Sequence, residues 1–498
     1  MMEVSWGTAA AVTVVAGAAA VFFAVVKWAA KSFNEWIYEA KLGERRMALP
    51  PGDLGWPLIG NMLGFLRAFK SKNPETFIDS YVSRFGKIGV YKVHLFGNPS
   101  VVVTTPETCR KVLTDDEAFQ PGWPRAAVEL IGKKSFIEMP VEEHKRLRRL
   151  TSAPVNGFEA LSNYIPYIEE NVLKSLDKWS TMGPIEFLTQ LRKLTFTIIM
   201  YIFLSAESES VMESLEKEYT RLNYGVRALR INLPGFAYHK ALKARKNLVA
   251  ALQGIVTERR KRRLGKWAPK RKDMMDALID VEDENGRKLT DEEIIDILVM
   301  YLNAGHESSG HTMMWATILL NQHPEVLKKA KEEQEEIVRR RPPGQKGLTL
   351  KECREMEYLS KVVDETLRYV SFSLVVFREA QMDVNLNGYL IPKGWKVLAW
   401  FRSIHYDDEV YPDPKKFDPS RWDGFIPKAG EFLPFGAGSR LCPGNDLAKL
   451  EICIFIHYFL LNYKLEWLTP DCPILYLPHS RPKDNCLAKI SKNSSTVA

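Results

Sequence analysis

The sequence predicts a mainly α-helical protein with small β-sheets, held behind one N-terminal transmembrane helix. Three observations predict this fold class. Residues 4–26 carry no charged side chain. Residues 88–103 and 386–397 are typical of two β-hairpins, because strand-forming residues flank turns that contain Asn and Gly. Most of the remaining chain spaces its apolar residues at helical intervals, and the longest such run follows Thr290.

The uncharged N-terminal run is long enough to cross a membrane. As a helix its 23 residues span roughly 34 Å, against a hydrocarbon core of ~30 Å. Glu3 precedes the run, and Lys27 and Lys31 follow it. The positive-inside rule therefore leaves the downstream body in the cytosol. Two alternatives are a cleavable signal peptide, which would place basic residues before a shorter run, and a buried Ala-rich core helix.

A segment rich in proline and glycine, residues 49–60, follows the apolar run. Proline fixes φ and glycine permits tight turns, so this segment is neither helix nor strand. No comparable break occurs later in the chain. We therefore expect a transmembrane anchor at 1–30, a linker and Pro-rich hinge at 31–60, and one catalytic domain at 61–498.

Composition excludes several classes of protein. Hydrophobic residues make up 46% and charged residues 26% of the 498 positions, which argues against disorder and against a multi-span membrane protein. The six cysteines form no Cys-x-x-Cys pair, which argues against a disulfide scaffold, a zinc ribbon and a cysteine-held iron–sulfur cluster. The net charge of +8 gathers near residues 259–272 and after the N-terminal run. This distribution favours a solvated helix end or contact with anionic lipid, and not nucleic acid.

The long central helix should begin with a capping box at Thr290 and Glu293 and run to about residue 321, ahead of Pro324. Its middle, residues 303–311, is polar and contains two glycines. His306 and His311 are five residues apart, about 140° around a helix, so they cannot share one zinc ion as a His-Glu-x-x-His pair does. Within the same stretch Glu307 and Ser308 place an acid beside an alcohol. That pair is either a proton relay or a buried polar pair satisfied by backbone.

Residues 434–446 form a glycine-rich loop before a second apolar helix. The N-terminus of that helix would direct partial positive charge at the sulfur of Cys442, and Arg440 adds a full charge. Both should lower the pKa of the thiol and favour the thiolate. A lone thiolate in such a loop suits one iron ion with an open face, as in haem with an axial sulfur ligand. The alternative, an inert buried cysteine, does not explain the loop.

Four motifs in this chain resemble those of the cytochrome P450 family, the haem-thiolate monooxygenases. The first is the haem-binding loop, and the others are the Glu-x-x-Arg motif at 365–368, the region 417–422 that supplies a second arginine, and the oxygen-activation motif at 304–308. They occur in the family's order and the resemblance covers essentially the whole chain. It implies the cytochrome P450 fold and a haem b cofactor. The loop residues that match are Phe435, Gly438, Arg440, Cys442 and Gly444.

The resemblance also implies a role for each matching residue. Cys442 would be the axial ligand of the haem iron. Glu307 and Ser308 would be the catalytic pair that delivers protons, although the family more often has threonine at the second position. His144 stands where the family often has tryptophan, which puts its role in doubt. The haem propionates would be bound by Arg148, Arg378 and Arg440, and the fold would be held by the ion-pair triad of Glu365, Arg368 and Arg421.

Electrons must come from a partner protein, because the chain contains no Gly-x-Gly-x-x-Gly motif. The family implies NADPH–cytochrome P450 reductase as that partner, with O₂ as co-substrate. The anchor implies a single-pass protein of the endoplasmic reticulum membrane with its catalytic domain in the cytosol. A glycosylation sequon begins at Asn493, and a cytosolic tail should carry no glycan there.

Within the family, the chain is similar to plant enzymes that act on isoprenoids, closest to the ent-kaurenoic acid oxidases. This implies multistep oxidation of ent-kaurenoic acid towards gibberellins. One alternative is oxidation of a triterpene such as β-amyrin. Another is a non-catalytic haem protein that binds a hydrophobic ligand. The expected pocket walls, which ordinary core packing would explain equally well, are residues 119–139, Tyr301, Leu302 and residues 371–376.

Overall fold

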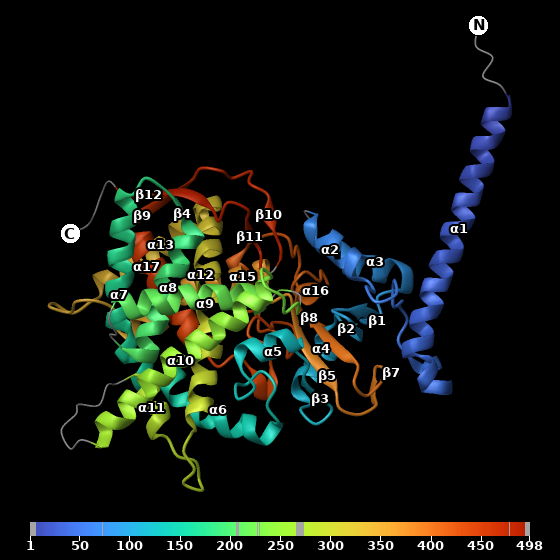
Figure 1. The fold of residues 1–498 in the computed structure, drawn as a ribbon. Helices are drawn as coiled ribbons and strands as arrows, with labels where there is room; N and C mark the ends of the chain where they lie inside the picture. The colour runs from blue at the N-terminus through green and yellow to red at the C-terminus, as the bar shows by residue number, and fades with distance from the viewer. Residues whose placement is uncertain are drawn as a thin grey trace.

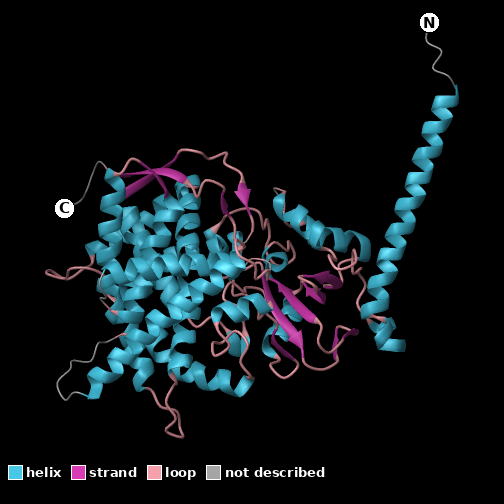
Figure 2. Cartoon of the chain, in the orientation of Figure 1, coloured by secondary structure: helices cyan, strands magenta, loops and turns pink. Residues whose placement is uncertain are grey.

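A computed structural model describes residues 6–71, 73–205, 209–226, 228, 230–264, 273–477 and 479–493. A block of helices and a smaller sheet region form the body, and the first helix projects from it (Figures 1 and 2). The prediction of a mainly helical protein with small sheets is confirmed. The segment 265–272, which holds part of the basic run, and Ser494 and Ser495 of the sequon lie outside the described residues.

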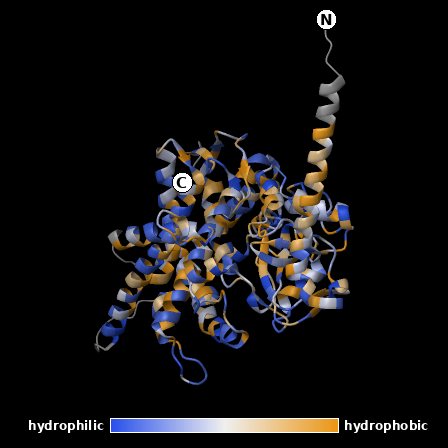
Figure 3. Cartoon of the chain, turned by 45° about the vertical axis from the view of Figure 1, so that its right-hand side comes forward, coloured by the Kyte–Doolittle hydropathy of each residue, from blue (hydrophilic) through white to orange (hydrophobic). Residues whose placement is uncertain are grey.

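The first helix, α1 (Trp6–Tyr38), stands away from the body over most of its length (Figure 1). Its apolar stretch Val14–Val26 leaves large side chains in the open, with Val21 64% and Phe22 65% exposed. Figure 3 colours this half of α1 largely hydrophobic. An apolar helix that the body does not cover is compatible with a membrane anchor.

Helix α8 (Phe187–Leu204) is also long and apolar enough to span a membrane, but 67% of it is buried inside the body. It packs against the central helix α12 (Asp291–Gln322), which also contacts α15 (Glu357–Val370) and α17 (Asn445–Asn462). Helix α8 is therefore a core helix. Because α12 is covered on several sides, most of its residues are buried, and it fixes the geometry of the helical block.

The prediction for α12 is confirmed at both ends. The hydroxyl of Thr290 accepts the amide of Glu293 at 3.2 Å, and the Glu293 carboxylate accepts the amide of Thr290 at 2.7 Å. The helix ends at Gln322, two residues before Pro324. It passes through the polar stretch 303–311 without a break.

The largest sheet has five strands in the order β1-β2-β8-β5-β3. Strands β1 (Val90–Leu95) and β2 (Asn98–Val103) form the first predicted hairpin, and β6 (Val384–Leu386) and β7 (Tyr389–Ile391) form the second. Strand β8 (Lys396–Trp400) was expected beside that second hairpin, but it pairs in parallel with β2 and antiparallel with β5 (Val375–Ala380). The remaining partner is β3 (Phe119–Pro121).

The other elements complete the body around α12 and the five-stranded sheet. The remaining strands are β4 (Pro184–Glu186), β9 (Tyr463–Trp467), β10 (Ile474–Leu475), β11 (Arg481–Pro482) and β12 (Leu487–Lys492). The remaining helices are η1 (Ala40–Ala48), α2 (Met62–Lys70), α3 (Thr76–Phe85), α4 (Pro106–Thr114), α5 (Arg125–Ile131), α6 (Val141–Asn156), α7 (Phe158–Thr181), α9 (Glu209–Val226), α10 (Ala237–Leu264), α11 (Met274–Asp280), α13 (Pro324–Arg339), α14 (Leu350–Arg354), α16 (Phe401–His405), η2 (Pro419–Trp422) and η3 (Gly438–Arg440).

Candidate functional site

The loop before α17 folds tightly around Cys442. Gly438 has a φ of 73°, and a Cβ there would lie 2.4 Å from the carbonyl oxygen of Leu113 on α4, so only glycine fits. The amide of Cys442 donates to the carbonyl of Phe435 at 2.9 Å, which closes the loop. Gly444 precedes the first residue of α17. These contacts fix the backbone on both sides of the sulfur.

The electrostatics at Cys442 differ from the sequence prediction. Burial raises the pKa of its thiol, while the backbone N–H of Gly444 and the charge of Arg148 oppose that rise. The prediction of a lowered pKa was wrong in direction, and Arg148, not Arg440, is the cation that acts on the sulfur. Desolvation outweighs the helix terminus because the sulfur has little contact with water. A thiolate here needs a cation bound directly to it, such as a metal ion.

Three arginines from separate elements surround His144 of α6. Burial lowers the pKa of His144 to about 4, and the charges of Arg440, Arg148 and Arg378 add to that effect. Arg378 is 5% exposed, and burial together with the charge of Arg440 lowers the pKa of its guanidinium to about 10. In the described part of the chain, none of the three arginines is ion-paired with a carboxylate. Arg378 is buried and Arg148 and Arg440 are half-buried. The charge of Asp116 acts on Arg378 and Arg440 without forming an ion pair with them.

The donor set at this place fits haem. A cysteine sulfur is an axial ligand for haem iron, and unpaired guanidiniums suit the two propionates. Arg440 donates to the carbonyls of Phe136 at 3.4 Å and Met139 at 3.0 Å, but its buried Nε atom has no hydrogen-bond partner among the described residues. A buried donor without a partner costs free energy unless a ligand satisfies it.

One face of α12 is open although its neighbours are buried. Ala304 is exposed and Ser308, one turn later, is half-buried, while Leu302, His306 and Glu307 are buried. The Ser308 hydroxyl donates to the carbonyl of Ala304 at 2.8 Å. An exposed alanine in the middle of a core helix marks a hollow beside the helix. The Ser308 side chain lies at that hollow with its hydrogen bonded to backbone.

The carboxylate of Glu307 is held by two other helices. One oxygen accepts from Arg192 of α8 at 2.9 Å, and the other accepts from Asn223 of α9 at 2.9 Å. The Glu307 side chain is 8% exposed. Its backbone carbonyl is 2.7 Å from the ring nitrogen Nδ1 of His311. Glu307 is therefore a paired, buried carboxylate one residue from the Ser308 hydroxyl.

Sequence analysis missed Arg192 and Asn223. The only signal for Arg192 is that it and Lys193 are charged in the otherwise apolar segment of α8. Asn223 lies among polar residues of α9 and carries no such signal. Their sequence separations from Glu307 are 115 and 84 residues, so only the tertiary fold brings them to the carboxylate.

The predicted ion-pair triad is present. Arg368 and Glu365, both 0% exposed, share two hydrogen bonds of 2.7 and 2.8 Å, and Arg421 approaches the same carboxylate at 3.5 Å. The rest of the Arg368 guanidinium donates to the carbonyls of His405, Pro414 and Lys416. The group ties α15 to the chain that leads to the Cys442 loop.

A family model described as cytochrome P450 matches residues 50–485. The chain belongs to the cytochrome P450 family. As members of this family are haem-thiolate proteins, the fit of the Cys442 loop and the arginine cluster to haem agrees with the assignment. This cytochrome P450 is a monooxygenase by family.

Individual relatives of this P450 are close. It is 68% identical over 467 residues to ent-kaurenoic acid oxidase 1 of Arabidopsis thaliana, which covers 94% of this chain and 95% of the relative. It is 55% identical over 460 residues to a 7,8-epoxymelianol synthase of Ailanthus altissima, with 92% of each chain covered. Among solved structures, retinoic acid-bound cyanobacterial CYP120A1 superposes with a TM-score of 0.78 at 28% identity, over 89% of this chain and 99% of that one.

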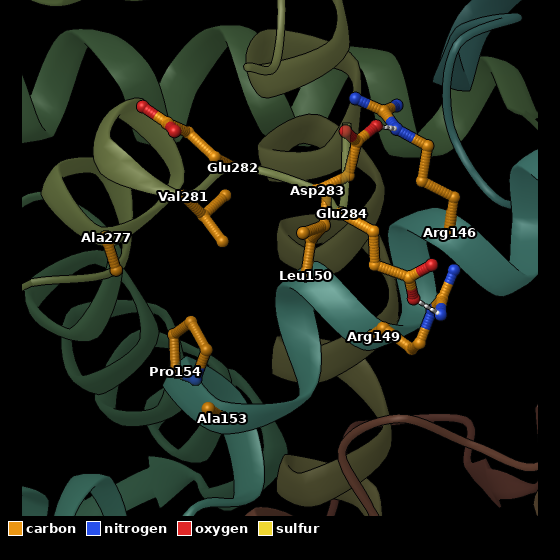
Figure 4. Close-up of a pocket in the computed structure, with 10 residues that line it drawn as sticks. All are labelled: Arg146, Arg149, Leu150, Ala153, Pro154, Ala277, Val281, Glu282, Asp283 and Glu284. Atoms are coloured by element: carbon orange, nitrogen blue, oxygen red, sulfur yellow. Dashed lines mark hydrogen bonds and ion pairs between the residues drawn. The ribbon is translucent and has the colours of Figure 1, made fainter. Parts of the chain in front are cut away.

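A surface pocket of about 400 Å³ lies elsewhere on the P450, between α6, α11 and residues 281–284 (Figure 4). Ion pairs of Arg146 with Asp283 and of Arg149 with Glu284 lie along one side of it (Figure 4). None of its lining residues belongs to the Cys442 loop or to α12.

Of the expected pocket walls, Leu302 lines a small apolar cavity with residues of α8, α9 and α10, and Tyr301 donates to the Thr151 hydroxyl at 3.0 Å.

Proposed function

We propose that this cytochrome P450 oxidises ent-kaurenoic acid in successive steps towards gibberellins. The observation that carries the proposal is 68% identity, over nearly the whole length of both chains, to ent-kaurenoic acid oxidase 1 of Arabidopsis thaliana. Identity at this level extends far beyond the motifs that all P450s share.

In this proposal Cys442 would hold the iron of a haem b through its sulfur. The propionates would be bound by Arg148, Arg378 and Arg440, which supply cationic charge and form no ion pair within the described residues. Phe435, Gly438 and Gly444 shape the loop that presents the sulfur. Bound haem supplies the activation of O₂ and the oxidation of an unactivated C–H bond.

Glu307 and Ser308 are proposed to deliver protons from α12 to the place where O₂ would react. Glu307 is a buried carboxylate whose position is fixed by Arg192 and Asn223. The Ser308 hydroxyl now donates to the carbonyl of Ala304, and a χ1 rotation frees it to donate into the hollow. Serine lacks the methyl group that restricts threonine, so this rotation is easier here than in the commoner Asp/Glu–Thr pair.

The protein is proposed to be a single-pass protein of the endoplasmic reticulum membrane, with α1 as anchor and the body in the cytosol. Electrons would come from NADPH through NADPH–cytochrome P450 reductase. The anchor has support from the uncovered apolar side chains of Val14–Val26. The basic residues that follow this stretch favour the cytosolic orientation of the body.

The proposal is tested by co-expressing the full chain with the reductase in microsomes and supplying ent-kaurenoic acid and β-amyrin separately. We expect oxidised products, identified by mass, from ent-kaurenoic acid and none from β-amyrin. The reverse result would support the triterpene alternative. The experiment includes β-amyrin because a relative of 55% identity is named for a different substrate.

Variants separate an oxygenase from a non-catalytic haem protein. Glu307→Gln should keep haem and the reduced carbon monoxide spectrum while product formed per NADPH falls at least tenfold, because the carboxylate can no longer transfer a proton. Cys442→Ser should lose the spectrum that depends on sulfur ligation. If Glu307→Gln forms as much product per NADPH as the wild type, the proposed role of Glu307 in proton transfer is contradicted. If the wild type binds a ligand but forms no product, the protein is a non-catalytic haem protein.

A further inference from the structure

Both ends of the segment 119–139 lie against arginines that would bind the haem propionates. At its start, Pro121 of β3 pairs with Arg378 of β5. At its end, the carbonyl of Met139 accepts from Arg440 at 3.0 Å. Helix α5 lies in the middle of this segment and packs against α9, α10 and α12 (Figure 1). Helix α5 therefore lies over the proposed haem position, and its seam with α9 and α10 is a boundary between that position and solvent.

One carboxylate at this seam accepts hydrogen bonds from two other elements. Arg230, in the segment between α9 and α10, donates to the two oxygens of Glu129 on α5, through Nε at 3.0 Å and through Nη2 at 2.5 Å. The hydroxyl of Tyr238 on α10 donates to the same carboxylate. A guanidinium fork with an added hydroxyl is a donor set that matches a carboxylate. We call Arg230 and Tyr238 the carboxylate site.

The carboxylate site has a fixed donor, but its present occupant is loosely held. Tyr238 is 2% exposed, and burial raises the pKa of its hydroxyl, which therefore keeps its proton and remains a donor. The side chains of Arg230 and Glu129 are 54% and 30% exposed, whereas those of the structural pair Arg368 and Glu365 are 0% exposed. An ion pair this open to water contributes little to stability. Glu129 can therefore leave the site at small cost.

The charges around Glu129 favour an anion at this position. The bond from Arg230 lowers the pKa of the Glu129 carboxyl, and the charge of Lys133 acts in the same direction. An apolar acid that enters a protein must lose the water around its own carboxylate, which costs free energy unless other donors replace that water. The carboxylate site offers such donors at the boundary where the water is lost.

We propose that Glu129 occupies the place of a substrate carboxylate, and that ent-kaurenoic acid displaces it and is received by Arg230 and Tyr238 as the substrate passes α5. The inference rests on the proposed function, because it takes the substrate to be an apolar carboxylic acid. The exchange replaces one carboxylate by another, so the donors of the site stay satisfied. The displaced Glu129 side chain turns to water, to which it is already partly open. The site thus selects an acid before the substrate reaches haem.

The rate of substrate binding tests this exchange. Full-length, haem-loaded protein in detergent micelles is mixed with ent-kaurenoic acid in a stopped-flow instrument, and the shift of the haem absorption band gives the association rate constant. The methyl ester of the same acid is the matched ligand, because it keeps the apolar skeleton and carries no charge. The quantity compared is the ratio of the rate constant for the acid to that for the ester.

Three variants alter the carboxylate site, and one is a control. The site variants are Arg230→Gln, Tyr238→Phe and Glu129→Gln. The control is Arg221→Gln, because Arg221 is 51% exposed on α9 and pairs with Glu218 of its own helix. Any loosening of the seam between α5 and the helices α9 and α10 changes the entry of both ligands, so it cancels in the ratio of acid to ester.

The ratio should move in opposite directions in the two variants of the ion pair. In Arg230→Gln it should fall by about fivefold, because the cation that attracts the acid is gone. In Glu129→Gln it should rise by about threefold, because a neutral amide competes less well for Arg230 than a carboxylate does. Tyr238→Phe removes one of three donors and should lower the ratio by about twofold. Arg221→Gln should give the wild-type ratio.

A purely structural ion pair predicts a different pattern. If the pair only holds the seam closed, Arg230→Gln and Glu129→Gln will change both ligands alike, and an unchanged ratio in these two variants would overturn the proposal. If Arg230→Gln fails to bind haem, Arg230→Lys replaces it. Lysine keeps the charge and loses the fork, so the ratio should still fall, by about twofold.

The wild type reveals a failure of the proposed function. If ent-kaurenoic acid produces no spectral shift and no product with the wild type, both the substrate assignment and the carboxylate site are refuted. If the wild type binds and oxidises the acid while the ratio is the same in every variant, only the carboxylate site is refuted.

Discussion

Glu451 should make the stability of this P450 fall as the pH rises. It lies on α17, is 1% exposed, and neither carboxyl oxygen has a hydrogen-bond partner of good geometry in the described residues. Burial raises the pKa of this carboxyl to about 8, and the Ser309 hydroxyl across the interface with α12 lowers it only in part. The test substitution is Glu451→Gln, which keeps the shape of the side chain and replaces the carboxyl with an amide that does not titrate.

The sign and size follow from linkage. The folded protein keeps a proton that the unfolded chain releases above pH ~4.5, so burial costs the wild type stability between that pH and about 8. With one pKa unit worth about 1.4 kcal/mol, the cost is about 1 kcal/mol at pH 5 and about 4 kcal/mol at pH 8. The glutamine amide does not titrate, so its own burial cost is the same at each pH. Between pH 5 and pH 8 the free energy of unfolding of the variant should therefore rise by about 3 kcal/mol relative to that of the wild type.

Urea unfolding followed by far-ultraviolet circular dichroism, at four pH values between 5 and 8, measures this gain. The difference between variant and wild type matters, because all other titrating groups are common to both. Glu332→Gln on the exposed face of α13 is the control and should give a flat difference. If the stability difference between Glu451→Gln and the wild type is also independent of pH, the reasoning is refuted, and water or an ion solvates the carboxyl.

Two further pairs of substitutions test the packing. Arg368→Met should lower the free energy of unfolding by about 3–5 kcal/mol in urea titrations, because it leaves the Glu365 carboxylate buried without its main partner. Arg421→Met removes a 3.5 Å contact with Glu365 and hydrogen bonds to exposed backbone carbonyls, but it leaves both bonds between Arg368 and Glu365 in place. It should therefore cost less, and equal urea midpoints for the two variants would contradict the ranking. Gly132→Ala places a Cβ within 2.2 Å of the Asp296 side chain. Gly388 also has a positive φ, but a Cβ there would meet no atom within 4 Å. Gly388→Ala should therefore cost about 1–2 kcal/mol from backbone strain alone, and Gly132→Ala should cost more. Comparable thermal midpoints for the two alanine variants would argue against the clash.

Local sequence was sufficient for the elements whose information is local. The ends of α12 follow from the Thr290 capping box and Pro324, and the turns of both predicted hairpins follow from Asn and Gly pairs. The positive φ of Gly438 in the loop around Cys442 is also local, although the close approach of this glycine to the Leu113 carbonyl arises only in the folded chain. For the helix ends and the hairpin turns, the deciding interactions join residues only a few positions apart.

The partners of the site residues could not be predicted in this way. Arg192 and Asn223 reach Glu307 from two other helices. The pKa of Cys442 moves opposite to the prediction, because desolvation sums contributions from every element that covers the sulfur. The pairing of β8 with β2, across nearly three hundred residues, follows from how the sheet assembles and not from the turn that precedes it.

By itself, the sequence determined the family, the uncharged N-terminal run, the central helix and the loop that presents Cys442. These depend on residue type and short-range spacing, which backbone sterics and capping translate directly into local structure. Only the tertiary structure decided which groups surround Glu307, that three arginines from separate elements lie near His144, and that Asn34 holds the hinge to α1. Burial and pairing of charge depend on distances between elements far apart in the chain, and only the folded chain sets those distances.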